Sequence, residues 1–233
     1  MCYSIKNKNE MEEENMYIVC LDFEGIVAPE MWVAYANASG ISQLTRTTRD
    51  EPDYDKLMNW RLNILREHGQ GLNEIQAAID TCEPLEGAKE FLDELREMVQ
   101  TVIVSDTFEE FAKPLIKKLN MPTILCHSLE VAEDGMITDY NLRIKSDTKL
   151  NTIKAFQSVG YEVIAVGDSF NDLDMIKNAE HGFLFKSTDQ IKEDHPELPA
   201  FETFEELLDA IKKVIKNRLW RSEERRVGKE CRS

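Results

Sequence analysis

The segment YIVCLDFEG at residues 17–25 joins a continuous apolar run to two acidic residues and a glycine. Such a run, rich in β-favouring residues, is typical of a parallel strand that is buried on both faces. Residues 101–107 (TVIVSDT) and 163–172 (VIAVGDSFND) repeat the arrangement, and residues 124–125 and 182–185 predict two further strands. We therefore expect polar side chains at the carboxyl ends of buried strands, where open α/β sheets bind their ligands.

Helical patterns lie between these predicted strands, at residues 87–99, 108–119, 148–159, 172–178 and 204–215. The second of these helices is preceded by Thr107-x-x-Glu110, which predicts a capping box at its start. Alternation of strands and helices predicts an α/β fold, with a parallel sheet flanked by helices and joined by right-handed crossovers.

Residues 29–84 interrupt the alternation because they contain no run typical of a strand. Their pattern predicts helices over residues 30–39, 41–47, 54–68 and 73–81. An all-helical insertion directly after the first strand is expected to form a small cap over the carboxyl edge of the sheet. The alternative is a helical subdomain with no role at the site. The core domain would then comprise residues 16–28 and 85–220.

The two ends of the chain do not fit this pattern. Residues 1–15 are polar, contain three consecutive glutamates and lack periodicity, so we interpret them as a disordered or non-native extension. Residues 221–233 (RSEERRVGKECRS) also lack a core pattern and are interpreted as a non-native tail. The alternative for the second segment is a genuine charged tail.

Composition restricts the classes of function. The 233 residues carry 28 Lys and Arg against 44 Asp and Glu, for a formal net charge of −16, which argues against binding to nucleic acid. No apolar run approaches the roughly 20 residues needed to span a bilayer, and no signal peptide opens the chain. The five cysteines include no C-x-x-C pair, so free thiols and a cytoplasmic location are expected.

The acidic residues at the strand ends suit phosphoryl transfer. Asp22 can attack phosphorus and hold a phosphoryl group, which splits one difficult step into two easier ones. Two anions must then meet, so a Mg²⁺ ion is expected, held by Asp22 and Asp168 with Asp172 close by. Glu24 lies two residues after Asp22, on the same side of an extended chain. It can protonate the leaving oxygen and later deprotonate a water.

Two further groups are expected to contact the phosphate. Ser105, with the backbone N–H groups that follow it at a helix N-terminus, can bind phosphate oxygens. Lys149 can neutralise the remaining negative charge. Taken singly these signals are weak, because an Asp after a strand is often a turn former and a lone lysine is commonly at the surface.

The order DFEG, SDT, lysine and GDSFND resembles the four motifs of the haloacid dehalogenase-like phosphohydrolases. The resemblance implies a Rossmannoid core, Asp22 as nucleophile and Glu24 as general acid and base. It also implies Mg²⁺ bound by Asp22, the backbone carbonyl of Glu24 and Asp168. Most members of the family have aspartate where this chain has Glu24.

Residues 16–205 are similar to the family's bifunctional phosphoserine phosphatase/homoserine phosphotransferase group. The segments DFEGIVAPEMW, TTRDEPDYDKLMNWRLNIL, PLEGA, SDTFEEF and GDSFND carry the likeness. It implies O-phospho-L-serine as substrate, L-homoserine as a second acceptor and a homodimer. It assigns substrate contacts to Glu30, Arg61, Ser105, Asp106, Lys149 and Asn171. Lys145 competes with Lys149 for the lysine position, because the segment that leads to Lys149 is one residue longer here.

The chemistry of phosphoserine fits these assignments. Arg61, on a predicted cap helix, is suited to bind the carboxylate through paired hydrogen bonds, and Glu30 to pair with the ammonium group. Without the resemblance, we would interpret Glu30 as a negative charge that is favourable near the start of a helix because of the helix dipole, and Arg61 as an exposed charge on a helix. Two other functions stay open: a phosphatase for another small phosphate ester, and an inactive module that binds a phosphorylated ligand.

Overall fold

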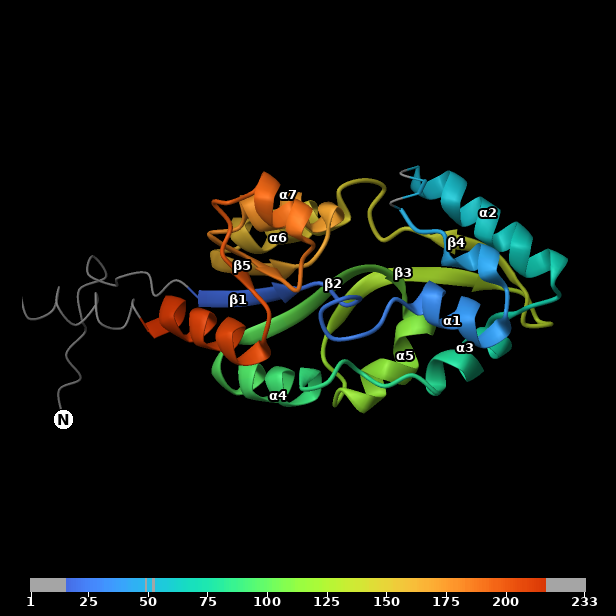
Figure 1. Cartoon of the computed structure of the whole chain (residues 1–233), viewed down its shortest axis with the longest axis horizontal. Coiled ribbons are helices and arrows are strands. Elements are labelled where there is room, and N and C mark those ends of the chain that lie inside the picture. Colours follow the sequence, from blue (N-terminus) through green and yellow to red (C-terminus); the bar gives the residue numbers. More distant parts are fainter. Residues whose placement is uncertain (1–15, 49, 52, 217–233) are drawn as a thin grey trace, which may run out of the picture.

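The computed structural model describes residues 16–216 with the exception of residues 49 and 52, so the predictions for residues 1–15 and 221–233 lie outside the described residues. Its centre is a seven-stranded sheet in the order β4-β3-β2-β1-β5-β6-β7 (Figure 1). The strands are β1 (Met16–Leu21), β2 (Gln100–Phe108), β3 (Ile124–Val131), β4 (Ile137–Asn141), β5 (Tyr161–Gly167), β6 (His181–Phe185) and β7 (Ala200–Phe201). Neighbouring strands are parallel except β3 and β4.

Helices cover both faces of the sheet, which confirms the predicted α/β class. They are α4 (Ala88–Met98), α5 (Glu109–Lys118), α6 (Thr148–Ser158), the short η3 (Phe170–Asp172), α7 (Leu173–Asn178), α8 (Asp189–Asp194) and a helix over residues 204–216. Alternate residues of β1 face the two layers: Val19 and Leu21 belong to the core with α4 and α5, whereas Ile18 and Cys20 belong to the core with α6 and α7. Burial on both faces explains the continuous apolar run of this strand.

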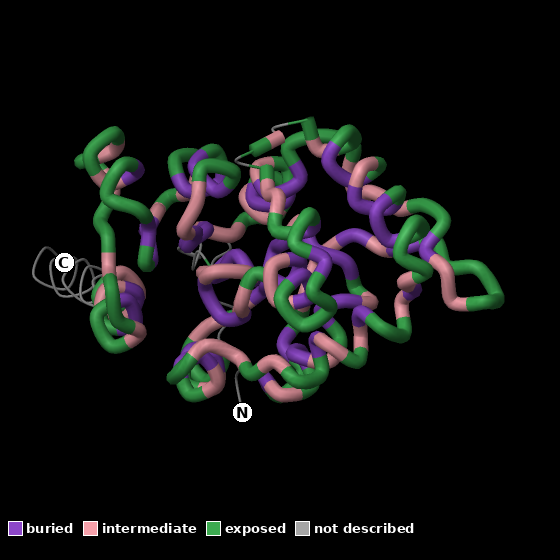
Figure 2. The backbone as a smooth tube through the Cα atoms, turned by 45° about the vertical axis from the view of Figure 1, so that its right-hand side comes forward, coloured by how far each residue is buried: buried purple, intermediate pink, exposed green. Residues whose placement is uncertain are grey.

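The segment between β1 and α4 consists of α1 (Met31–Ser39), η2 (Ser42–Thr45), α2 (Tyr54–Glu67) and α3 (Leu72–Asp80). Among its described residues, the predicted absence of a strand is confirmed. Its two connections to the core meet, because the Leu85 N–H donates to the Val27 carbonyl at 3.1 Å. These helices lie at one end of the sheet (Figure 1). Along α2, buried residues alternate with exposed ones (Figure 2).

The hairpin of β3 and β4 was not predicted. The sequence indicated a short strand at residues 124–125 and a wholly parallel sheet, but β3 continues to Val131 and pairs antiparallel with β4. The hairpin is at the sheet edge, and Glu130, Val131, Thr138 and Asp139 are exposed. A strand with this exposure has no continuous apolar run to mark it.

The capping box predicted at the start of α5 is also wrong. β2 continues to Phe108, so Thr107 lies within the strand and α5 begins at Glu109. The Glu110 carboxylate accepts a hydrogen bond from the Leu129 N–H at 3.0 Å instead of folding back onto its own helix. A long-range partner on β3 has replaced the local cap.

No helix in the described part of the chain is long and apolar enough to cross a membrane.

Candidate active site

Three adjacent parallel strands bring the predicted motifs to one edge of the sheet. Leu21 is level with Ile103 of β2 and with Val166 of β5. The Asp22 N–H continues the ladder and donates to the Val166 carbonyl at 3.0 Å. The residues at the ends of these strands therefore meet at the carboxyl edge, beside the point between β1 and β5 where the strand order changes direction.

A buried cluster of charge forms at this edge. Oxygen atoms of Asp22, Asp168 and Asp172 lie within 4.8 Å of one another. Lys149 Nζ, at the start of α6, lies 2.9 Å from Asp22 Oδ1 and 2.6 Å from Asp172 Oδ1. Asp22, Asp172 and Lys149 are all buried, whereas Lys145 is exposed. The structure therefore places Lys149, and not Lys145, beside Asp22.

Asp172 organises the loop that follows β5. Its Oδ2 accepts hydrogen bonds from the Asp168 N–H and the Ser169 N–H, both at 3.1 Å, and from Ser169 Oγ at 3.0 Å. Its Oδ1 accepts a hydrogen bond from Lys149 Nζ. Both oxygens of Asp172 thus have protein partners, which fix its carboxylate between Lys149 and the loop.

The cluster carries more negative charge than one lysine balances. Burial, followed by the Asp172 carboxylate, raises the pKa of Asp22 well above its usual value, although Lys149 acts against this. The pKa of Lys149 is raised well above its usual value because the attraction of Asp172 and Asp22 outweighs the effect of burial. Lys149 is therefore charged, and the site still favours a further cation.

Gly25 makes room for Asp168. Its φ of +79° is a conformation that favours glycine, and a Cβ there would lie 2.6 Å from Asp168 Oδ2. The Ser187 hydroxyl donates to the Asp168 carbonyl at 2.8 Å and holds the loop from the other side. Carboxylate oxygens brought together in this way form a hard donor set that suits Mg²⁺. The residues present fit the metal that the sequence predicted.

Glu24 follows in a tight turn in which the Val27 and Ala28 N–H groups both donate to the Phe23 carbonyl at 3.0 Å. Its Oε1 accepts from the Met31 N–H and from Thr107 Oγ1, each at 3.4 Å. Burial, and then the charge of Glu30, raise the pKa of Glu24 to about 8. Glu24 therefore holds a proton at neutral pH, as a general acid must.

Two predicted substrate contacts from the helical insertion differ in their surroundings. Glu30 is exposed at the start of α1, and its side chain does not cap that helix. Arg61, on α2, is buried, so its interpretation as an exposed helix charge is wrong. Burial lowers the pKa of Arg61 to about 10, although Glu24, Tyr54 and Glu30 oppose the shift. The guanidinium is thus held as a cation in a desolvated place.

The remaining predicted contacts lie beside the cluster. Ser105 is buried and its Oγ accepts from the Thr107 N–H at 3.2 Å. The prediction that Ser105 lies at a helix N-terminus is wrong, because it lies in β2. Asp106 is half-buried, and Asn171, in η3, is exposed and hydrogen-bonded to Ser169 Oγ.

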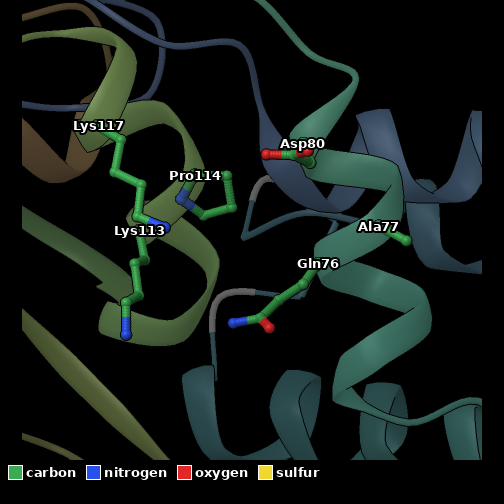
Figure 3. A pocket seen from close by; sticks show the side chains of 6 residues that line it. All are labelled: Gln76, Ala77, Asp80, Lys113, Pro114 and Lys117. Carbon is green, nitrogen blue, oxygen red and sulfur yellow. The ribbon is translucent and has the colours of Figure 1, made fainter.

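Two hollows accompany these residues. One, of about 390 Å³, lies between the start of α2, the loop before α6 and η3, and its lining includes Asp106, Lys149 and Asn171. The other, of about 440 Å³, lies between α3 and α5 and is lined by Gln76, Ala77, Asp80, Lys113, Pro114 and Lys117 (Figure 3). None of the six belongs to the sequence motifs, so the first hollow is the candidate entrance.

A family model described as haloacid dehalogenase-like hydrolase matches residues 26–180. The chain belongs to this family. The haloacid dehalogenase-like core explains why the nucleophile candidate, Ser105 and the acidic loop lie on or directly after adjacent strands.

Relatives within the haloacid dehalogenase-like family carry more specific names. A phosphoserine phosphatase of Pseudomonas syringae pv. tomato is 50% identical over 199 residues, covering 85% of this chain and 84% of the relative. Phosphoserine phosphatase ThrH of Pseudomonas aeruginosa is 50% identical over 192 residues, covering 82% and 93%. A solved phospho-aspartyl intermediate analogue of a phosphoserine phosphatase, 21% identical, aligns with a TM-score of 0.70 over 84% of this chain and 99% of that one. The last likeness shows a shared fold.

Two residues beside the site of this haloacid dehalogenase-like hydrolase were not predicted. Tyr54 donates its hydroxyl proton to the Asp106 carbonyl at 3.1 Å, and His127 Nε2 lies 3.6 Å from Asp106 Oδ1. His127 Nδ1 accepts from the Arg143 N–H, so the neutral ring carries its proton on Nε2, toward Asp106. Burial lowers the pKa of His127, which favours this neutral form. No spacing in the sequence links these residues, because they come from α2, β2 and β3.

Proposed function

We propose that the protein is a Mg²⁺-dependent phosphoserine phosphatase that acts through a phospho-Asp22 intermediate and also transfers the phosphoryl group to homoserine. The observation that carries the proposal is the buried contact of Lys149 with Asp22, beside Asp168 at the carboxyl edge of the sheet. The names of the relatives that are 50% identical support phosphoserine as the substrate. We also propose a cytoplasmic location and a homodimer.

In this proposal an Asp22 oxygen attacks phosphorus as the bond from phosphorus to the seryl oxygen breaks. Glu24 gives its proton to the leaving seryl oxygen, and Lys149 balances charge on the phosphoryl oxygens. Mg²⁺, held by Asp22, the Glu24 carbonyl and Asp168, would neutralise the anions that meet. Asp172 keeps Lys149 and the loop after β5 in place.

The second half of the reaction reverses the role of Glu24. The carboxylate takes a proton from an incoming hydroxyl while the oxygen of that hydroxyl attacks phosphorus, which releases Asp22. Water gives inorganic phosphate, and the homoserine hydroxyl gives phosphohomoserine. Hydrolysis and transfer share every protein group and differ in which hydroxyl enters the site.

The amino-acid part of the substrate is assigned to the helical insertion, which we propose acts as a cap over residues 29–84. Arg61 binds the substrate carboxylate and Glu30 pairs with the ammonium group. Ser105, Asp106 and Asn171 contact the substrate from the core. Arg61 suits its role because it is a buried cation for which the described residues supply no ion pair.

The nucleophile is tested with Asp22→Asn. Phosphate release from O-phospho-L-serine with Mg²⁺ should fall by at least about 10⁴-fold, because the amide cannot form the intermediate, while the circular dichroism spectrum is unchanged. Homoserine added to the unchanged protein should reduce phosphate release as phosphohomoserine appears. Turnover retained in Asp22→Asn would refute the intermediate. Release that ignores homoserine would leave a simple phosphatase.

The substrate is tested with Arg61→Ala and Glu30→Gln. Each should lower kcat/KM for phosphoserine by about 100-fold, the effect of a lost charge-assisted contact, and change turnover of an aryl phosphate far less. Equal losses on both substrates would favour a phosphatase for another small ester. Binding of phosphoserine without any phosphate release would favour an inactive module.

A further inference from the structure

Arg61 is buried, and no described carboxylate forms a salt bridge with it, although Glu24 and Glu30 lie near enough to act on its charge. Its Nη2 donates to the Arg46 carbonyl at 2.8 Å, and its Nη1 lies 3.8 Å from Met58 Sδ, a weak acceptor. Its Nε is buried and has no hydrogen-bond partner. Within the part of the chain that the structure describes, no carboxylate pairs with this guanidinium, so most of its donor capacity is left for a ligand.

The aromatic ring of Trp32 packs against the Arg61 guanidinium and stabilises its charge. The Arg61 guanidinium carbon lies 4.5 Å from the centre of that ring, and both side chains are more than nine-tenths buried. A cation over an indole face is stabilised by the electrons of the ring, most strongly where water is excluded. This contact holds a positive charge without supplying a negative one.

Trp32 is in turn held by the core. Its ring meets Phe111 of α5 edge to face, with centroids 5.1 Å apart. Phe111 follows the SDT motif by only a few residues and is itself fully buried. Phe111 therefore contacts Trp32, and Trp32 contacts Arg61. These contacts fix the Arg61 side chain, on α2, relative to the edge of the sheet where phosphate is expected to bind.

We propose that Trp32 is a positioning residue that keeps Arg61 in place for a carboxylate-bearing phosphate ester, and that it thereby sets the preference for amino-acid substrates. The inference rests on the proposed function, because it takes Arg61 as the carboxylate contact. An acidic residue in the place of Trp32 would hold Arg61 as firmly but would compete with the substrate carboxylate. The ring avoids that competition.

The test compares O-phospho-L-serine with O-phosphoethanolamine, which has the same phosphate and ammonium groups but lacks the carboxylate. Trp32→Leu and Trp32→Met should lower the ratio of their kcat/KM values about 30-fold, mainly through a higher KM for phosphoserine. This is the ~2 kcal/mol of a desolvated cation–π contact, converted at about 1.36 kcal/mol per factor of ten. Trp32→Phe, which keeps an aromatic face, should restore much of the ratio.

Trp60→Leu is the matched control, because Trp60, on α2, also stacks with an arginine: the Arg46 guanidinium carbon lies 5.4 Å from the centre of its ring. It should leave the ratio unchanged. If both aliphatic Trp32 variants fold, as thermal unfolding shows, but keep the ratio, Trp32 is only a core residue and the inference is overturned. If Arg61→Ala also keeps the ratio, the proposed carboxylate contact fails instead. A changed ratio for Arg61→Ala alone separates the two failures.

Discussion

Gly25 shows at the scale of one residue how backbone conformation and site chemistry are linked. Its φ of +79° turns the chain between Asp22 and the helical insertion, and the space left by its missing side chain is filled by the Asp168 carboxylate. Any side chain at this position strains the backbone and displaces a proposed metal ligand. The glycine of DFEG is therefore required twice, by the turn and by the acidic cluster.

Gly25→Ala should lower the free energy of unfolding by at least about 1 kcal/mol, because of backbone strain, and should reduce kcat/KM by at least about 100-fold as Asp168 moves. Gly40→Ala is the control, since Gly40 has a φ of +73° with nothing within 4 Å of an added Cβ. It should lose similar stability and keep its activity. Equal activity losses in the two variants would show that the close approach to Asp168 is unimportant. Urea unfolding and phosphate release measure the two effects.

At the scale of elements, the ends of β1 and β5 and the start of α6 together create an excess of negative charge. Lys149 occupies one side of the cluster, between Asp22 and Asp172, and Asp168 lies on the side of Gly25. Each strand end contributes part of the cluster, and neither is a site alone. A divalent cation that enters should relieve the repulsion between carboxylates and stabilise the folded state.

Addition of Mg²⁺ to metal-free protein should raise the free energy of unfolding, by about 2.7 kcal/mol at a concentration 100 times the Kd. Asp168→Asn should abolish most of this increase because it removes a carboxylate from the cluster. Asp174→Asn, which changes an exposed acid on the neighbouring α7, should retain it. Thermal unfolding with and without Mg²⁺ measures the shift independently of activity. A full Mg²⁺ response in Asp168→Asn would exclude this residue as a ligand.

At the scale of the whole molecule, the helical insertion is tied to the core on two sides. On one side, Lys118 of α5 donates to the carbonyls of Asp80 and Cys82 at the end of α3, at 2.9 and 2.7 Å. On the other, Tyr54 of α2 binds the Asp106 carbonyl, and Tyr140 of β4 donates to Asp55 Oδ1 at 2.5 Å. The second side borders the hollow beside Lys149, so these tyrosine contacts connect the insertion to the proposed entrance.

Tyr54→Phe should cost about 1 kcal/mol of stability, the net value of one hydrogen bond, and should raise the KM for phosphoserine about 5-fold. The reason is that the Asp106 carbonyl loses its donor and the insertion loses a contact with the core beside the proposed entrance. Tyr140→Phe removes a contact to the exposed Asp55 and should change KM by less than about 2-fold. If Tyr140→Phe had the larger effect, the contact of the hairpin with Asp55, and not that of Tyr54 with Asp106, would be the one that positions the insertion for substrate binding. Steady-state kinetics and urea unfolding distinguish the two outcomes.

The sequence was enough to predict the α/β class, the buried strands that carry Ser105 or lead into Asp22 and Asp168, and the helical insertion. These depend on local patterns: an apolar run marks a strand buried on both faces, and helical spacing marks a helix covered on one side. The edge hairpin of β3 and β4 lacked such a run and was missed. Glu110 was assigned to a local cap because its partner, Leu129, is distant in the sequence.

The packed structure was needed to place Lys149, and not Lys145, beside Asp22, to show that Asp172 is hydrogen-bonded by its own loop, and to place Arg61 against Trp32. Each of these depends on which side chains meet after the strands and helices have packed. A lysine or an arginine looks the same in the sequence whether it is solvated or buried, because its position in the chain does not specify its neighbours. Burial and partner atoms, which set charge and geometry at this edge of the sheet, exist only in the folded chain.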